Sequence, residues 1–277
     1  MEGYAEFYRN YYRPLVSRFF GRSITAESIH HEQSGYASQL AQSLGPWLHD
    51  VVPGAELLDI GGSTGVVASE FVQTFGYQST VLDPAPDELQ IARARGLEVV
   101  DGFLEYYDPG TRRFDLVLMC QTIDHLLKLN VSLDRIRELV KPDGYFFCDI
   151  VDFEETCYVT GCIEGALHVD HCYYVSQETA SWMFSSFGWA VIYVDIAMRP
   201  GHVGYLLKPG NIDRTTEPLD TSARLRGLQR LQTQWHLASQ HTYGVARWLR
   251  KRAYRAKQYL RRLHNYEEKK TCSNAAS

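Results

Sequence analysis

A run of glycines and small polar residues, from Asp59 to Gly65 (D-I-G-G-S-T-G), is the part of this 277-residue chain whose residue types most clearly predict a binding site. Leu57, Leu58 and Ile60 form the short apolar run that a buried parallel strand requires, and we expect a helix from Val66 onward. Glycines let the backbone approach a ligand closely, and a helix N-terminus offers unpaired N–H groups. The stretch therefore predicts a strand, turn and helix that together hold a nucleotide-like ligand.

Strands and helices alternate after this turn and would bring further polar side chains beside it. An acidic residue about twenty positions past the glycines can accept both ribose hydroxyls of an adenosine ligand. Asp83 lies eighteen positions after Gly65, at the end of the second expected strand. A second interpretation makes Asp83 the N-cap of the next helix. The alternation predicts a doubly wound parallel sheet that binds its ligands at the carboxyl ends of the strands, with strands over residues 79–82, 97–100, 114–119 and 145–151.

The order of these motifs resembles that of the class I S-adenosylmethionine (AdoMet)-dependent methyltransferases. Their first motif is usually D/E-h-G-x-G-x-G, and here Ser63 stands in place of the middle glycine. Phe114-Asp115-Leu116-Val117 resembles their F-D-h-h strand, and Lys141-Pro142-Asp143-Gly144 resembles their L-K-P-G-G turn. The resemblance covers about residues 50–210. It implies a mostly parallel, seven-stranded, Rossmann-like α/β sheet that ends in an antiparallel hairpin, over residues 189–197 and 202–208.

The resemblance also implies which residues contact AdoMet. In this family an acidic residue after the third strand commonly meets the adenine amino group, while an apolar neighbour covers the ring. Asp101 and Phe103 stand at these positions, and Asp83 would hold the ribose. The full set of implied AdoMet contacts is Asp59, Gly61, Gly62, Ser63, Gly65, Asp83, Asp101, Gly102, Phe103 and Gln121.

Methyl transfer from a sulfonium is an in-line displacement, so the protein must align the acceptor and remove a proton if the acceptor is a hydroxyl or an acidic C–H. Residues just after strand four lie close to the sulfonium in this fold. His125 is therefore the leading candidate for the general base, and Asp124 could orient it or the substrate. In the competing interpretation, both residues cap or pack the following helix. His171 belongs to a segment that resembles the family's H-x-x-y-h-S pattern, and it is a second catalytic or substrate-orienting candidate.

The segment over residues 152–175 also contains Cys157, Cys162, His168, His171 and Cys172, which are enough ligands for a zinc ion. It has no C-x2-C pair, however, and reduced cysteines are common small core residues. We therefore interpret this segment as a wall of the substrate pocket and assign no metal.

The sequence divides into four parts. Residues 1–50 are expected to form an N-terminal helical cover, because aromatic residues recur at spacings of three and four over residues 3–20 and a second helix is expected to end near Leu48. The aromatic helix either packs on the core or closes over the pocket as a lid, and Pro14 could kink or divide it. The other parts are an AdoMet-binding domain over residues 51–208, a linker over residues 209–221, and a basic helical extension with a disordered end over residues 222–277.

The net charge of −5 is unevenly distributed. From Ser222 onward thirteen lysines and arginines face two acids, a balance of +11, which leaves −16 for the first 221 residues. Such an acidic body argues against a nucleic-acid substrate. The basic amphipathic extension predicts contact with an anionic membrane surface or an acidic partner, or else packing on the acidic body of its own subunit or of a second subunit in a homodimer.

The sequence contains no run of eighteen apolar residues, and its N-terminus does not have the pattern of a secretory signal. We expect a cytoplasmic protein with mostly reduced cysteines. Its predicted function is AdoMet-dependent methyl transfer to a small-molecule or sugar-like acceptor. The alternatives are a non-catalytic AdoMet-binding or scaffold protein whose basic tail recruits a partner, and a nicotinamide-dependent reductase.

Overall fold

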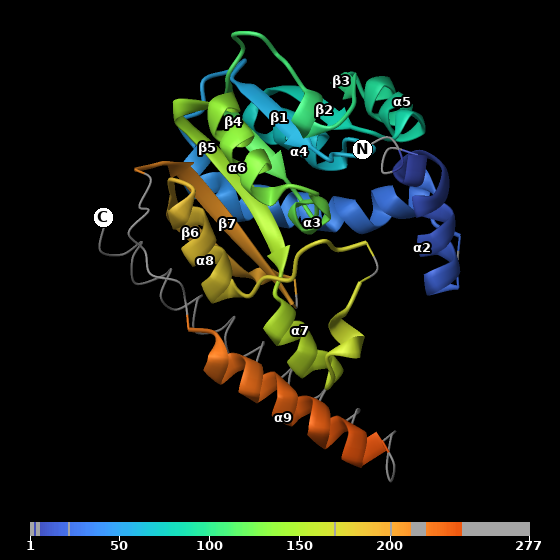
Figure 1. Ribbon diagram of the computed structural model, residues 1–277. Coiled ribbons are helices and arrows are strands. Elements are labelled where there is room, and N and C mark those ends of the chain that lie inside the picture. The colour runs from blue at the N-terminus through green and yellow to red at the C-terminus, as the bar shows by residue number, and fades with distance from the viewer. Residues whose placement is uncertain are drawn as a thin grey trace.

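The computed structural model describes Gly3 and residues 6–21, 23–168, 170–199, 201–211 and 220–239. A seven-stranded sheet in the order β3-β2-β1-β4-β5-β7-β6 forms its centre (Figure 1). Strands β1 to β5 run parallel to one another, and β7 pairs antiparallel with both β5 and β6. The predicted α/β fold with a closing hairpin is therefore confirmed. The strands are β1 (Glu56–Ile60), β2 (Gln78–Asp83), β3 (Glu98–Asp101), β4 (Phe114–Met119), β5 (Val140–Val151), β6 (Trp189–Arg199) and β7 (His202–Pro209).

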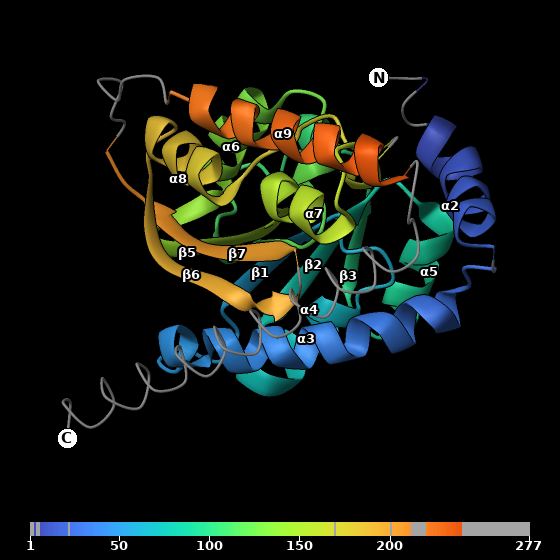
Figure 2. The ribbon, with the colours of Figure 1, turned by 90° about the horizontal axis from the view of Figure 1, so that it is seen from below.

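Helices cover both faces of the sheet, as the view from below shows (Figure 2). α3 (Ala26–Leu48) and α4 (Val66–Phe75) lie on one face, whereas α6 (Leu129–Leu139) and α8 (Gln177–Ser186) lie on the other. Each layer encloses its own cluster of buried apolar residues. β1 and β4 consist mostly of buried apolar residues, because strands inside a parallel sheet are covered on both faces. α5 (Pro86–Ala94) connects β2 to β3.

Two expected boundaries were wrong. The expected turn over residues 141–144 is the first part of β5, which pairs with β4 through a register shift between Phe114 and Leu116. At Gly144 a Cβ atom would lie 2.9 Å from the carbonyl oxygen of Asp115, so a glycine lets the two strands approach here. The N-terminal helix is divided between Tyr11 and Tyr12 rather than at Pro14, into a π-helical turn η1 (Phe7–Tyr11) and α2 (Tyr12–Phe20). Proline fits the first turn of α2, where backbone N–H groups lack helical partners.

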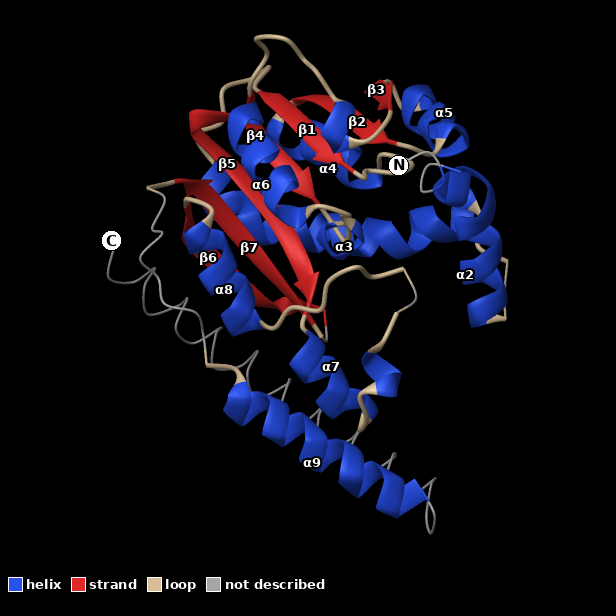
Figure 3. Ribbon diagram, in the orientation of Figure 1, coloured by secondary structure: helices blue, strands red, loops and turns tan. Residues whose placement is uncertain are grey.

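The described part of the basic extension is α9 (Ser222–Ser239), which packs against α7 (Phe153–Thr160) (Figure 3). Leu228 of α9 belongs to a small buried cluster with Cys157 and Ala166. Arg224 forms ion pairs with the acids Glu154 and Glu178. Residues 212–219 of the expected linker and residues 240–277 lie outside the described residues. None of the helices in the described ranges is long and apolar enough to cross a membrane.

Candidate active site

The glycine turn between β1 and α4 has little room for side chains. Gly61 and Gly65 have φ values of 70° and 71°, in the left-handed region that favours glycine. A Cβ atom at Gly61 would lie 2.5 Å from Thr122 Oγ1, and one at Gly62 would lie 2.6 Å from Asp59 Oδ2. Ser63, which stands where the family usually has a glycine, also has a positive φ of 52°. The turn is therefore packed tightly against its neighbours and exposes its backbone to the adjoining cavity.

Asp83 ends β2 beside this turn. Its Oδ2 accepts a hydrogen bond from the Ser63 backbone N–H at 2.9 Å, and its Oδ1 accepts one from the Ala85 N–H at 2.8 Å. Burial and the neighbouring Glu88 raise the pKa of Asp83 to about 6. Asp83 also lines a cavity of about 220 Å³, so its carboxylate is positioned to meet a ligand held there.

Asp59, an expected AdoMet contact, does not line this cavity. Its side chain is buried beneath Gly62 with 1% of its surface exposed. Burial and the negative charge of Asp83 raise the pKa of Asp59 to about 7. The structure therefore places Asp59 under the turn, as a group that supports it from below. Successive side chains of a strand point to opposite faces, which explains why a motif residue can turn away from the ligand.

Residues of the N-terminal cover form one side of the cavity. Arg13 of α2 donates from Nε to Glu88 Oε1 at 2.5 Å and from Nη2 to Ser63 Oγ at 3.4 Å. Ser63 Oγ also donates to Glu88 Oε2. The cover is thus attached directly to the glycine turn and to α5, as a lid would be. The cavity lining contains Tyr8, Tyr12, Arg13, Gln33, Gly61, Ser63, Asp83, Glu88, Gly102, Phe103, Gln121, Thr122 and His125, among others.

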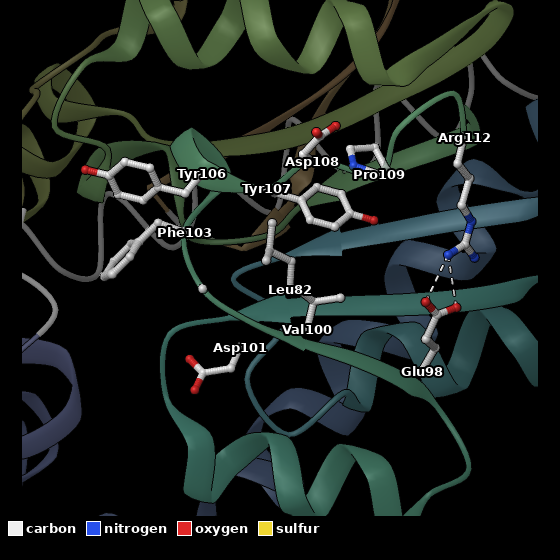
Figure 4. Close-up of a pocket in the computed structure, with 11 residues that line it drawn as sticks. Leu82, Glu98, Val100, Asp101, Phe103, Tyr106, Tyr107, Asp108, Pro109 and Arg112 are labelled. Carbon is white, nitrogen blue, oxygen red and sulfur yellow. Dashed lines mark hydrogen bonds and ion pairs between the residues drawn. The ribbon is translucent and has the colours of Figure 1, made fainter.

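A second cavity, of about 400 Å³, adjoins the first, and the two share Leu82, Gly102 and Phe103 in their linings. Figure 4 shows the Phe103 ring and the Asp101 carboxylate at one end of it and the Glu98–Arg112 ion pair at the other. The Asp101 carboxylate is half-exposed and lies 3.3 Å from Arg9 Nη2. Asp101 is the last residue of β3 and lines the second cavity, whereas Gly102 and Phe103 follow the strand and line both cavities.

His125 ends the short helical turn η3 (Ile123–His125) and lines the first cavity. Its Nδ1 lies 3.0 Å from the Asp170 carbonyl oxygen and 3.9 Å from the Asp170 carboxylate. A carbonyl can only accept a hydrogen bond, so Nδ1 carries the proton and Nε2 carries the lone pair. Burial lowers the pKa of His125, although the negative charge of Asp170 opposes the shift. The ring is therefore neutral at pH 7 and can accept a proton.

His171 stands next to His125, with ring centroids 4.9 Å apart, and its other face stacks on His168 at 4.5 Å. Burial, together with the positive charge that either neighbouring histidine can carry, lowers the pKa of His171 to about 4. His171 does not appear in the lining of the cavity and supports His125 from behind. Cys157, in contrast, is buried between α7 and α9, so the structure does not gather the five cysteines and histidines of this segment into one site.

Asp124, which the sequence suggested could orient His125 or the substrate, or else pack the following helix, has its side chain turned away from His125. Asp124 is buried, and its Oδ2 accepts a hydrogen bond from the Val151 N–H at 3.2 Å, while its carbonyl oxygen accepts one from the Cys172 N–H at 2.8 Å. Burial raises the pKa of Asp124 to about 7. Neighbouring residues on a helical turn do not face each other, so Asp124 points into the protein while His125 points to the cavity. Asp170 is the carboxylate that approaches His125.

Comparison with known proteins identifies the family of the chain, because the family model described as a methyltransferase domain matches residues 4–194. The chain belongs to this methyltransferase family. The predicted enzyme class, an AdoMet-dependent methyltransferase, and the predicted cofactor are thereby confirmed.

Curated relatives match this methyltransferase over part of their length. A ubiquinone biosynthesis O-methyltransferase of Methylobacterium sp. (strain 4-46) is 32% identical over 117 residues, which are 39% of this chain and 45% of that protein. The reducing polyketide synthase Preu2 of Preussia isomera is 29% identical over 126 residues, which are 42% of this chain and 5% of that protein. The matched region therefore spans less than half the length of these relatives.

Solved structures share the fold of this methyltransferase. A chain in the complex between the Haloferax volcanii Trm112 methyltransferase activator and the putative methyltransferase has a TM-score of 0.56 at 16% identity, covering 67% of this chain and 96% of that one. The mitomycin 7-O-methyltransferase MmcR has a TM-score of 0.53 at 18% identity, covering 66% of this chain and 56% of that one. At such low identity these similarities establish the fold.

Several cavity residues of this methyltransferase were missed by the sequence analysis. Gln33 reaches the cavity from α3, and its Oε1 is buried without a hydrogen-bond partner in the described part of the chain. A buried polar atom of this kind indicates a place for a polar ligand group. The only sequence feature that could have indicated Glu88 is its position in the first turn of the helix after Asp83. For Asp170 it is the position next to His171. Gln33 carried no signal at all, because a glutamine in a long helix is usually exposed.

Proposed function

We propose that this methyltransferase transfers the methyl group of AdoMet to a hydroxyl oxygen of a small molecule, and that His125 accepts the hydroxyl proton. The observation that carries the proposal is that one cavity contains both His125 and the group formed by the glycine turn and Asp83. A methyl donor held at the turn and an acceptor held at His125 would therefore share one enclosed space, as an in-line displacement requires.

The residues around the glycine turn fit AdoMet. The Asp83 carboxylate can accept hydrogen bonds from the ribose hydroxyls, and the unpaired Gln33 Oε1 can accept one from a donor group of the ligand. The N-cap residue of α4, Gly65, offers no side-chain cap, and the Asp59 carboxylate beneath the turn accepts a hydrogen bond from the Ala68 N–H. When bound, AdoMet supplies an electrophilic methyl group at its sulfonium. Gly102 and Phe103 would contact the adenine end, whereas Asp59 would act only by supporting the turn.

The other end of the cavity fits an acceptor that must lose a proton. Asp170 fixes the orientation of the His125 ring through Nδ1, which leaves Nε2 as the proton-accepting nitrogen. Tyr8 and Tyr12 lie edge-on to the same ring, each with centroids 6.3 Å from it. These aromatic side chains offer an apolar surface for a small ring-shaped acceptor. Similar proteins include ubiquinone biosynthesis O-methyltransferases and a mitomycin 7-O-methyltransferase, and these names support a small-molecule hydroxyl as the methyl acceptor. A sugar hydroxyl belongs to the same chemical class.

The test combines a binding measurement with a transfer assay. Calorimetric titration with AdoMet should give saturable binding, and Asp83→Ala should weaken it. Transfer to a panel of phenols and sugars is then followed by mass spectrometry for the wild type and for His125→Ala, with and without a chelator. Tight AdoMet binding without transfer to any hydroxyl, amine or carbon acceptor would favour a non-catalytic AdoMet-binding or scaffold protein. Transfer to an amine alone would contradict O-methylation.

We further propose that residues 1–50 act as the cover of this site and that residues 222–277 form a separate basic extension on a cytoplasmic enzyme. Packing of α9 on α7 supports an attachment to the enzyme's own acidic body over residues 222–239. For residues 240–277, the proposed contact is a membrane, a partner protein or a second subunit. Vesicle sedimentation and light scattering of the full chain, compared with a chain truncated after residue 239, would separate these contacts.

A further inference from the structure

Asp149, near the end of β5, is a buried carboxylate that lines neither cavity, and only 1% of it is exposed. Its Oδ1 accepts a hydrogen bond from the backbone N–H of Gln121 at 2.5 Å. We infer that Asp149 is a positioning residue for methyl transfer, because it holds Gln121 in the backbone conformation that forms the cavity wall between the glycine turn and His125.

The conformation of Gln121 requires such a partner. Its φ is 53°, and apart from Ser63 it is the one non-glycine residue with a positive φ in the described part of the chain. A residue with a Cβ atom is disfavoured in the left-handed region and stays there only when its surroundings hold it. The short bond to the Asp149 side-chain oxygen supplies this restraint, because it fixes the direction of the Gln121 N–H.

The position of this wall matters because the wall has no room to move. Gln121 and Thr122 line the cavity, and Thr122 lies against Gly61, where a Cβ atom would come within 2.5 Å of Thr122 Oγ1. Thr122 Oγ1 also donates to the Cys120 carbonyl at 2.9 Å, which keeps the loop compact. His125 follows three residues later and donates its own backbone N–H to the Thr122 carbonyl at 3.0 Å. A shift of Gln121 would therefore move both the contact between Thr122 and Gly61 and the helical turn η3 that carries His125.

Asp149 is itself held in place by the sheet. It pairs with Gly204 of β7 in the antiparallel register, and its Oδ2 lies 3.6 Å from Nδ1 of His202 on the same strand. The carboxylate thus links the rigid sheet to a loop residue that lines the cavity. Sites that are built on rigid elements hold their geometry better than sites built on loops alone.

The inference rests on the proposed function, since one of its two readouts is methyl transfer. The experiment is a double-mutant cycle of Asp149→Ala and Gln121→Gly, with AdoMet affinity measured by calorimetry and transfer measured by mass spectrometry. In the protein that keeps the wild-type Gln121, Asp149→Ala should lower kcat/KM on the order of 100-fold. This is the loss expected for a displacement of about 1 Å at a reacting group. In the Gln121→Gly background, the same substitution should cost roughly tenfold less, because glycine adopts the left-handed conformation without help.

Two further variants show whether the effect is one of positioning. Asp149→Asn keeps an oxygen that accepts from the Gln121 N–H, so it should retain most of the activity that Asp149→Ala loses. Asp195, a buried carboxylate on β6 that accepts a hydrogen bond from Ser43, serves as a matched control, and Asp195→Ala should leave the transfer rate at saturating AdoMet unchanged.

Equal losses from Asp149→Ala in both Gln121 backgrounds would overturn the inference, because the carboxylate would then act independently of the Gln121 backbone. Equal losses from Asp149→Asn and Asp149→Ala would overturn it as well, since the charge alone would be responsible. If the wild type binds AdoMet but transfers to no acceptor, the proposed function fails, and the cycle is then decided by AdoMet affinity alone.

Discussion

The two ends of the cavity differ in how their residues are distributed along the chain. The cofactor end takes most of its residues, including the glycine turn, Asp83 and Glu88, from thirty consecutive residues that run from β1 into α5. The acceptor end takes Tyr8 and Tyr12, His125, and Asp170 from three segments that are far apart in the sequence. Local backbone geometry therefore determines the cofactor end, whereas tertiary packing assembles the acceptor end. Changes at one end should thus leave the other end largely intact.

The largest expected effect separates the two ends. His125→Ala removes the proposed proton acceptor, so transfer to a hydroxyl should fall by about 10²–10⁴-fold while AdoMet affinity stays within a factor of about two. His49→Ala, at an exposed histidine after α3, is the matched control and should keep wild-type transfer. Full activity of His125→Ala on a hydroxyl acceptor would refute the role of His125, and a parallel loss of AdoMet affinity would show that the ends are coupled.

Gly61→Ala should instead damage the cofactor end. The new Cβ would meet Thr122 and would have to adopt a φ of 70°, so AdoMet affinity should fall by roughly 100-fold. Gly96→Ala is the matched control, because Gly96 also has a positive φ, of 84°, but has nothing within 4 Å of an added Cβ. Calorimetry on both variants separates backbone strain from the clash. Similar affinities for the two variants would show that the contact with Thr122 is unimportant.

A smaller effect should appear in the pH dependence of cofactor binding. The pKa of Asp83 is raised to about 6, so the carboxylate is ionised at pH 8 and becomes protonated as the pH falls through about 6. If the ionised form binds the ribose, AdoMet affinity should fall about tenfold for each pH unit below that value. Titrations between pH 5 and 8 should show this decrease for the wild type and a flatter profile for Asp83→Asn. Identical profiles would exclude Asp83 as the titrating group.

The smallest effect is expected where α2 contacts the glycine turn and α5. Arg13→Ala removes the contacts with Glu88 and Ser63 and shortens one side chain of the cavity lining. The Arg13–Glu88 pair is partly exposed, so AdoMet dissociation should quicken only about threefold, and added salt should reduce the difference. Stopped-flow release of AdoMet measures this, with Arg18→Ala on the exposed side of α2 as the control. Equal release rates for the two variants would show that α2 does not close the site.

The sequence predicted the fold well because its strands and turns depend on neighbouring residues, whereas the cofactor-binding residues stay predictions. The glycines of the turn, the buried strands and Asp83 each follow from local sterics or periodicity. The acceptor end was only partly predictable. His125 was found through its place after β4, but its carboxylate partner was assigned to the adjacent Asp124 instead of Asp170, which is forty-five positions away. Gln33 could not be identified because nothing local shows which helix faces the cavity, and the Asp149–Gln121 bond joins residues that are 28 positions apart.

The exposed thiol of Cys172 has a practical consequence for studies of the acceptor end. Cys172 lies next to His171, and its backbone N–H is bound to Asp124, whereas Cys148, Cys157 and Cys162 are buried. A thiol-reactive fluorophore should therefore attach under native conditions beside His171, once Cys120, which is partly exposed, and Cys272, which lies outside the described residues, are replaced by serine. The protein thus carries its own labelling position, from which acceptor entry could be followed in real time as a change in fluorescence.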